Sequence, residues 1–197
     1  MAACILYGRF VLSSVNNPLE DMKRILILSL IAAFAAVSQA QTVPRFARYD
    51  VAGTGCKVYL PADPGGFEMT LSEDSSEVYT AEVQDPDGFN FAVIVVKFSE
   101  PLSDDDDEKT DMMTSYLDFL QEQFSISGAA GYGKGHTMEN APEAVGVIDY
   151  WEDEDGLQYA VKSWCDGKFL AVMMLYGSEE YPLYNAQDMF LNGFRFP

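Results

Sequence analysis

FNFAVIVVKF, residues 89–98, is the stretch of sequence that decides the fold. The preceding Asp85–Gly88, with the sequence DPDG, predicts a tight turn into a strand. Apolar side chains then occupy both alternating positions, which is the pattern of a strand covered on both faces. A second run of the same kind, FLAVMML at residues 169–175, predicts another strand buried on both sides.

Other strands are expected before and after this run. Three are predicted ahead of it, at about residues 55–61, 67–71 and 78–83, and three after it, at about residues 145–151, 157–165 and 168–176. Glu152–Gly156 and the pair Asp166-Gly167 predict short turns. The last three strands therefore form an antiparallel meander.

A helix is expected between the two groups of strands. Ser103 can cap it, and Asp104–Glu108 fill its first turn, where carboxylates favour the positive end of the helix dipole. Its apolar residues recur at spacings of three and four: Met113, Tyr116, Leu117, Leu120 and Phe124. The acidic run thus has a structural explanation and is not needed as a metal site.

A final helix is expected at about residues 181–191. The predicted order is four strands, a helix, three strands and a helix (ββββ-α-βββ-α). The fold class is α+β, an antiparallel β-sheet sandwiched between helices and the N-terminal strands.

Residues 22–40 read as a signal peptide. A basic start, Met22-Lys23-Arg24, precedes an apolar run at 25–37, and small residues precede a cleavage site after Ala40. The run is shorter than the roughly 20 residues of a membrane span, although an uncleaved anchor is the alternative. Residues 1–21 are interpreted as a mis-assigned start or a leader, and residues 41–197 as a single exported domain, periplasmic or extracellular.

The chain is strongly acidic. It has 12 Lys and Arg against 31 Asp and Glu, a net charge of −19. Cleavage after Ala40 removes three basic and two acidic residues, so the mature net charge becomes −20. Phosphate backbones and anionic membranes repel such a chain, which excludes nucleic acid as a partner and leaves cationic partners and divalent metals.

The glycine-rich stretch GAAGYGKG, residues 128–135, differs by one residue from a phosphate-binding loop. Gly128, Gly133 and Lys134 fit the pattern, but Gly135 replaces the hydroxyl residue. A working loop follows a strand and opens a helix, whereas this one follows a helix and precedes a strand. We interpret it as a mobile helix-to-strand connector with Gly128 as a helix cap, and we predict no cofactor.

Two cysteines remain in the mature chain, Cys56 and Cys165. They permit one disulfide in an oxidising compartment, or two buried free thiols. A nucleophilic pair of Cys165 with His136 is disfavoured because no oxyanion-type motif lies nearby. His136 is the single histidine, which excludes a multi-histidine zinc site.

Two acidic turns resemble the start of a calcium loop, Asp85–Gly88 and Asp153–Gly156. Neither has the full twelve-residue spacing, and we interpret both as turns. Six aromatic residues could line a ligand groove, but a core role is favoured: Tyr132, Tyr150, Tyr159, Tyr176, Trp151 and Trp164. No catalytic, cofactor-binding or metal-ligating residue is predicted.

Several local strings resemble the PsbP-like family. They are Val58–Pro61, Leu117–Leu120, the meander Val145–Tyr176 and the closing Phe190–Phe196, and together they span most of residues 55–197. The resemblance implies an α/β/α sandwich and a non-enzymatic accessory or binding role. It supplies no catalytic residues.

The sequence predicts an exported, soluble, non-enzymatic binding or accessory protein of the bacterial cell envelope. Its partner is an unknown protein or a small ligand. One alternative is a hydrolase based on carboxylates that meet only in the fold. The other is a protein that binds calcium or manganese weakly.

Overall fold

The two doubly apolar strands lie side by side at the centre of one sheet. They are β5 (Asn90–Lys97) and β10 (Phe169–Gly177), paired antiparallel so that Phe91 lies opposite Leu175. The computed structural model describes residues 45–177 and 184–197, which belong to one compact unit. The prediction that both strands are covered on two faces is confirmed, because both run through the two core clusters.

The remaining strands extend the sheet to either side of this pair. Their bounds are β3 Glu68–Leu71, β4 Glu77–Gln84, β6 Ile126–Ala129, β7 Gly133–Met138, β8 Ala141–Asp153 and β9 Gln158–Cys165. The order is β3-β4-β5-β10-β9-β8-β6, with β7 also pairing with β8. Two further strands, β1 (Ala47–Asp50) and β2 (Lys57–Leu60), form a separate antiparallel pair.

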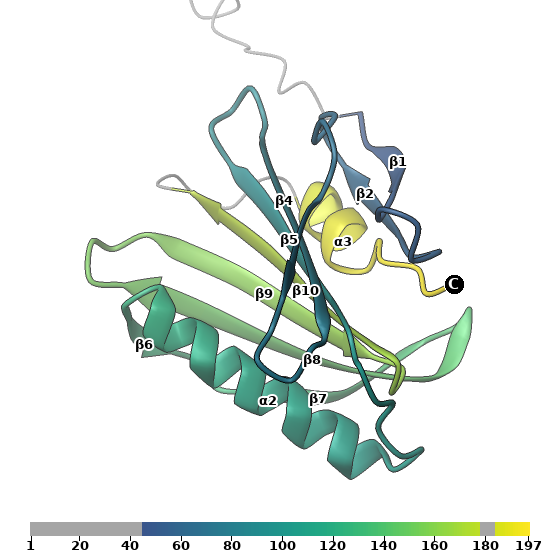
Figure 1. The fold of residues 1–197 in the computed structure, drawn as a ribbon. Coiled ribbons are helices and arrows are strands. Elements are labelled where there is room, and N and C mark those ends of the chain that lie inside the picture. Colours follow the sequence, from purple (N-terminus) through teal and green to yellow (C-terminus); the bar gives the residue numbers. More distant parts are fainter. Residues whose placement is uncertain (1–44, 178–183) are drawn as a thin grey trace, which may run out of the picture. The chain divides into compact units, whose positions relative to one another are not determined.

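Helices cover opposite faces of the sheet. The long helix α2 (Asp106–Gln123) packs on one face, whereas α3 (Tyr184–Leu191) and the β1–β2 pair cover the other (Figure 1). Each face has its own core cluster. The predicted α+β class, an antiparallel sheet between helices and N-terminal strands, is confirmed.

The strand count differs from the sequence prediction at three places. β1 is mostly exposed and polar, so no apolar alternation marks it. The stretch expected to be a mobile connector forms β6 and β7, which pair with the long strand β8, and Gly128 lies in β6 instead of capping a helix. Edge strands face solvent and need little apolar sequence, which is why the pattern did not reveal them.

The helix cap also differs from the prediction. Asp105, not Ser103, is the N-cap of α2, and its carboxylate accepts a 3.0 Å hydrogen bond from the Asp107 N–H. Ser103 instead donates its backbone N–H to the Glu108 carboxylate at 3.1 Å. The acidic residues at the start of α2 therefore have two roles. Asp105 accepts a hydrogen bond from a helix N–H group, and Glu108 accepts one from the loop that precedes the helix.

Some predictions fall outside the described residues. These are the leader at 1–21, the signal peptide at 22–40 and the first part of the final helix, residues 181–183. In the part of the chain that the structure describes, no helix combines the length and the apolar character needed to cross a membrane.

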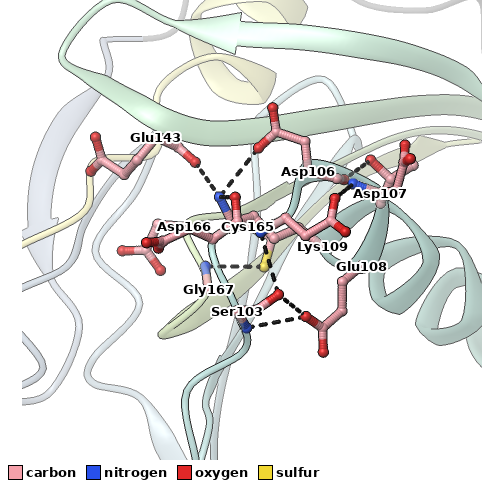
Figure 2. A network of polar contacts seen from close by, with 12 residues as sticks. Ser103, Asp106, Asp107, Glu108, Lys109, Glu143, Cys165, Asp166 and Gly167 are labelled. Atoms are coloured by element: carbon pink, nitrogen blue, oxygen red, sulfur yellow. Dashed lines mark hydrogen bonds and ion pairs between the residues drawn. The ribbon is translucent and has the colours of Figure 1, made fainter.

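A buried lysine bonds the first turn of α2 to β8. Lys109 is only 2% exposed, and its ammonium donates to the Glu143 carbonyl of β8 at 2.9 Å (Figure 2). The same ammonium lies 3.3 Å from the Asp106 carboxylate and 3.4 Å from the Asp104 carbonyl. Burying an ammonium is costly unless it is well bonded, so these contacts determine where the helix begins relative to the sheet.

The hairpin between β9 and β10 is tied to the same place. The Gly167 carbonyl accepts a 2.8 Å hydrogen bond from the Leu102 N–H. A Cβ atom at Gly167 would lie 3.6 Å from Cε of Lys109, and this glycine has a φ of +91°. The loop before α2, the hairpin and the start of β8 therefore meet around one side chain.

We predict that Lys109→Met destabilises the protein by about 2–4 kcal/mol, because it leaves the Glu143 and Asp104 carbonyls without their donor. Chemical denaturation measures the change in the free energy of unfolding. The matched control is the exposed Lys168→Met, which we expect to change stability by less than about 0.5 kcal/mol. Equal effects of the two substitutions would contradict the role assigned to Lys109.

Candidate functional site

The helix α2 covers only part of its face of the sheet. It packs on β8, β9 and β6, and Leu170, Val172 and Met174 of β10 are buried in the same cluster, whereas part of β4 and β5 on that face has no helix over it. The difference is visible along β5. On the α3 face, Phe91, Val93 and Val95 are at most 1% exposed. On the α2 face, Ala92 and Val96 are buried but keep 8% and 5% of their surface exposed, and Ile94 between them is only half-buried.

Two hollows lie along this uncovered part of the face. The first is about 460 Å³ and is lined by Pro64, Gly66, Glu68, Thr80, Ala81, Glu82, Ala92, Ile94, Phe124 and Met174. The second is about 480 Å³ and is lined by Ser72, Asp74, Ser76, Val78, Val96, Phe98, Ser99, Glu100, Leu102, Met112 and Tyr116. We call the two together the α2 groove.

The floors of the two hollows adjoin. Thr80 of the first hollow and Val78 of the second are two residues apart on β4, and therefore on the same face. Ile94 and Val96 stand in the same relation on β5. From Ala92 to Phe98 the floor extends about 20 Å, at about 3.3 Å per residue.

One flank of α2 forms the wall of the groove. Met112 and Tyr116 line the second hollow, and Phe119 follows on the same flank at helical spacing. Phe119 is 50% exposed, and its ring lies 6.0 Å from that of Tyr116. An apolar floor beside the exposed Phe119 and the half-buried Tyr116 is typical of surfaces that contact another macromolecule.

Carboxylates surround the apolar floor. Glu68 and Glu82 line the first hollow, and Asp74 and Glu100 line the second, whereas no described residue lining either hollow is basic. The Tyr176 hydroxyl donates to the Glu82 carboxylate at 2.7 Å. The Ser72 hydroxyl, and then Ser76, hold the pKa of Asp74 below its ordinary value.

The hydrolase alternative depends on carboxylates that converge in a deep pocket. The structure instead brings Glu68 and Glu82 to the side of an open groove, with both residues exposed. In the described residues, no group of three or more His, Cys, Asp or Glu side chains is placed to hold a metal ion.

The disulfide that the sequence permitted is not formed. Cys56 and Cys165 are both buried free thiols. Cys56 packs in the cluster under α3, and Cys165 packs in the cluster under α2, so the sheet separates them. Burial raises the pKa of each thiol to about 11.

His136 does not meet Cys165 either. It lies on β7, with Nδ1 3.5 Å from the ammonium of Lys162. That ammonium donates to Asn192 at 2.7 Å and lies 4.5 Å from the centre of the Trp164 ring. Burial, and then the Lys162 charge, lower the pKa of His136.

The remaining motifs have structural roles. Lys134 belongs to the edge strand β7, so the glycine-rich stretch leads into a strand and not into a phosphate-binding helix. Asp85 accepts backbone N–H groups from Asp87 and Phe89, and Asp153 accepts those of Asp155 and Leu157, as expected of turns.

Most of the aromatic residues singled out in the sequence pack in the core. Trp151 and Trp164 are buried, and Tyr159 stacks on Tyr176 with ring centres 4.9 Å apart. Tyr150 is the exception, since 42% of it is exposed.

The α2 groove was not predicted from the sequence. The signal lay in the width of the apolar stripe on α2: Met112, Tyr116 and Phe119 run beside the core stripe formed by Met113, Leu117 and Leu120. The apolar stripe is therefore wider than the contact between α2 and the sheet requires. Such a stripe indicates a second apolar contact.

No model of a protein family matches the chain, and no curated protein sequence matches it. Among solved structures, it is similar to the solution structure of cyanobacterial PsbP (CyanoP) from Synechocystis sp. PCC 6803. The match has a TM-score of 0.48 at 14% identity, and it covers 80% of this chain and 96% of that chain. The likeness is one of fold alone. We draw nothing about function from it.

We predict that Cys56 and Cys165 are unreactive thiols in a protein prepared as residues 41–197. In the native state, neither reacts readily with a thiol reagent at about pH 8, because burial holds both pKa values well above that pH. Unfolding in denaturant should expose both thiols, and a reductant should leave the melting temperature unchanged. Fewer than two thiols counted in denaturant would show that a disulfide exists.

We predict that the single histidine titrates below 6.5 in the folded protein. NMR of the His136 ring measures the midpoint, and Lys162→Met should move it part of the way back, because burial is the larger cause. The folded state prefers neutral His136, so its contribution to stability is complete above pH 6.5 and is lost as the pH falls through the folded pKa. A midpoint at or above 6.5 would contradict the described contacts.

Proposed function

We propose that this protein is a non-enzymatic accessory protein that binds a partner protein in the α2 groove. The observation that carries the proposal is the half-covered face of the central sheet. Its floor is apolar, yet Val78, Ile94 and the flanking Tyr116 are only half-buried. Apolar area left in water costs free energy that a partner recovers on docking, at about 25 cal/mol per Å².

The shape of the groove favours a macromolecular partner over a small ligand. The two hollows are open and together follow a floor of about 20 Å, whereas small-ligand sites enclose most of the ligand surface. The aromatic pair Tyr116 and Phe119 stands at the edge of the floor, where it can pack against a docked chain.

The compartment is part of the same proposal. The signal-peptide pattern at residues 22–40 supports export, and the high negative charge suits a soluble protein outside the cytoplasm. We therefore expect the partner among proteins of the cell envelope or secreted proteins.

Photo-crosslinking from the groove tests the proposal. A photo-reactive phenylalanine analogue replaces Phe119 in cells that produce the protein, and we expect one predominant adduct with another protein. The control position is Leu71, which is 65% exposed on β3 and lies on the opposite face of the sheet. Equal adducts from both positions, or none from Phe119, would refute the proposed function.

We predict that Ile94→Lys weakens binding of the crosslinked partner at least about tenfold, because it places a charge in the apolar floor. The long lysine side chain can extend to water, so the fold is expected to persist. Leu71→Lys is the matched control and should leave affinity unchanged. Affinity is measured by titration of the purified partner, after the melting temperatures of both variants have been compared with the parent.

A further inference from the structure

We infer that the α2 groove binds a basic amphipathic helix of its partner. The inference rests on the proposed function, since it concerns the same groove and states what kind of segment occupies it. Three properties of the groove support it: the paired backbone of its floor, its length, and the sign of the charge around it.

The apolar floor over β4 and β5 offers side chains but no strand edge, since the edge strand on this side is β3, which contributes only Glu68 to the lining. β4 is already paired with β3 and β5, and β5 is paired with β4 and β10. A segment lying on this floor finds no backbone partners there, so it must satisfy its own N–H and C=O groups. A helix does this internally, whereas an extended segment would leave those groups unpaired against an apolar surface.

The length and the wall of the groove also suit a helix. A floor of about 20 Å corresponds to about 13 helical residues at 1.5 Å per residue. The wall is the flank of α2 that carries Met112, Tyr116 and Phe119, and helices pack side by side at about 8–10 Å. A partner helix would therefore contact the sheet on one side and α2 on another, which requires a broad apolar stripe on it.

The charge around the groove selects a basic helix. The four carboxylates of Glu68, Glu82, Asp74 and Glu100 line the hollows, and the described lining includes no basic side chain. The whole chain, these four residues included, has a net charge of −19. Lysine or arginine on the polar face of the partner helix would meet this field, whereas a second copy of the same chain would be repelled by it.

Binding of synthetic peptides to the exported protein tests the inference. The probe is a labelled peptide of about 14 residues with leucine on one helical face and lysine on the other. One control peptide has glutamate in place of lysine. A second control has the same composition as the probe in an order that forms no apolar stripe. Fluorescence anisotropy gives the affinities at salt concentrations of about 50 and about 500 mM.

We expect the lysine helix to bind at least about tenfold more tightly than either control at the lower salt concentration, and more weakly as salt rises. Ile94→Lys should weaken its binding by a similar factor. The double variant Glu82→Gln/Glu100→Gln should weaken binding and reduce the salt dependence. The double variant Glu139→Gln/Glu154→Gln removes two exposed charges that line neither hollow, and its affinity should stay closer to that of the parent.

Each other outcome overturns a stated part of the inference. Equal binding of the reordered peptide would show attraction by charge alone, without a helix in the groove. Equal binding of the glutamate helix would remove the preference for a basic partner. A crosslink from Phe119 that stays within the chain, or a dimer of this protein that closes the groove, would mean that the chain itself is the occupant.

The inference and the proposed function fail in different ways. Mapping the protein adduct from Phe119 identifies the partner segment that lies in the groove. If that segment is acidic or is not helical, the inference fails and the proposed function stands. If Phe119 yields no adduct, the proposed function fails. Tight binding of the lysine helix would then show only that the groove can bind such a helix, not that a partner protein uses it.

Discussion

The structure depends on the pairing of β5 with β10. Both strands carry apolar side chains on both faces, so neither face of the central sheet can be left to water without a large loss of burial. This requirement explains the layered arrangement, in which α3 and the β1–β2 pair close one face and α2 packs on the other. The α3 face is closed over β5, whereas on the α2 face the closure is incomplete.

Lys109 holds the start of α2 against β8. Its buried ammonium bonds the Glu143 carbonyl at the start of β8 and holds the first turn of α2 beside the β9–β10 hairpin. The helix therefore packs on β8 and β9, and no described helix packs over the floor formed by β4 and β5. Leaving apolar side chains of this floor in contact with water costs stability. The binding role that we propose for the α2 groove would explain why the floor is apolar despite that cost.

The negative charge of the whole chain and the carboxylates around the groove act in the same direction. Carboxylates line an apolar floor, and the many other acidic residues add a field of the same sign. Long-range attraction of this kind would speed encounter with the basic partner that we propose, and apolar burial would supply most of the affinity after contact. Few described acidic residues have basic partners, since the ion pairs join Asp50, Glu77 and Asp106 to lysines.

The sequence by itself determined the α+β class, both doubly buried strands, the antiparallel meander and the long helix, because these depend on local periodicity and on turn residues such as Asp166-Gly167. It did not reveal the edge strands β6 and β7, whose exposed residues carry no pattern, or the cap at Asp105. Only the tertiary structure decided that Cys56 and Cys165 are separated by the sheet and that α2 lies over β8 and β9. Those outcomes depend on which distant strands pair and where a buried ammonium finds its acceptors, and the groove exists because of both.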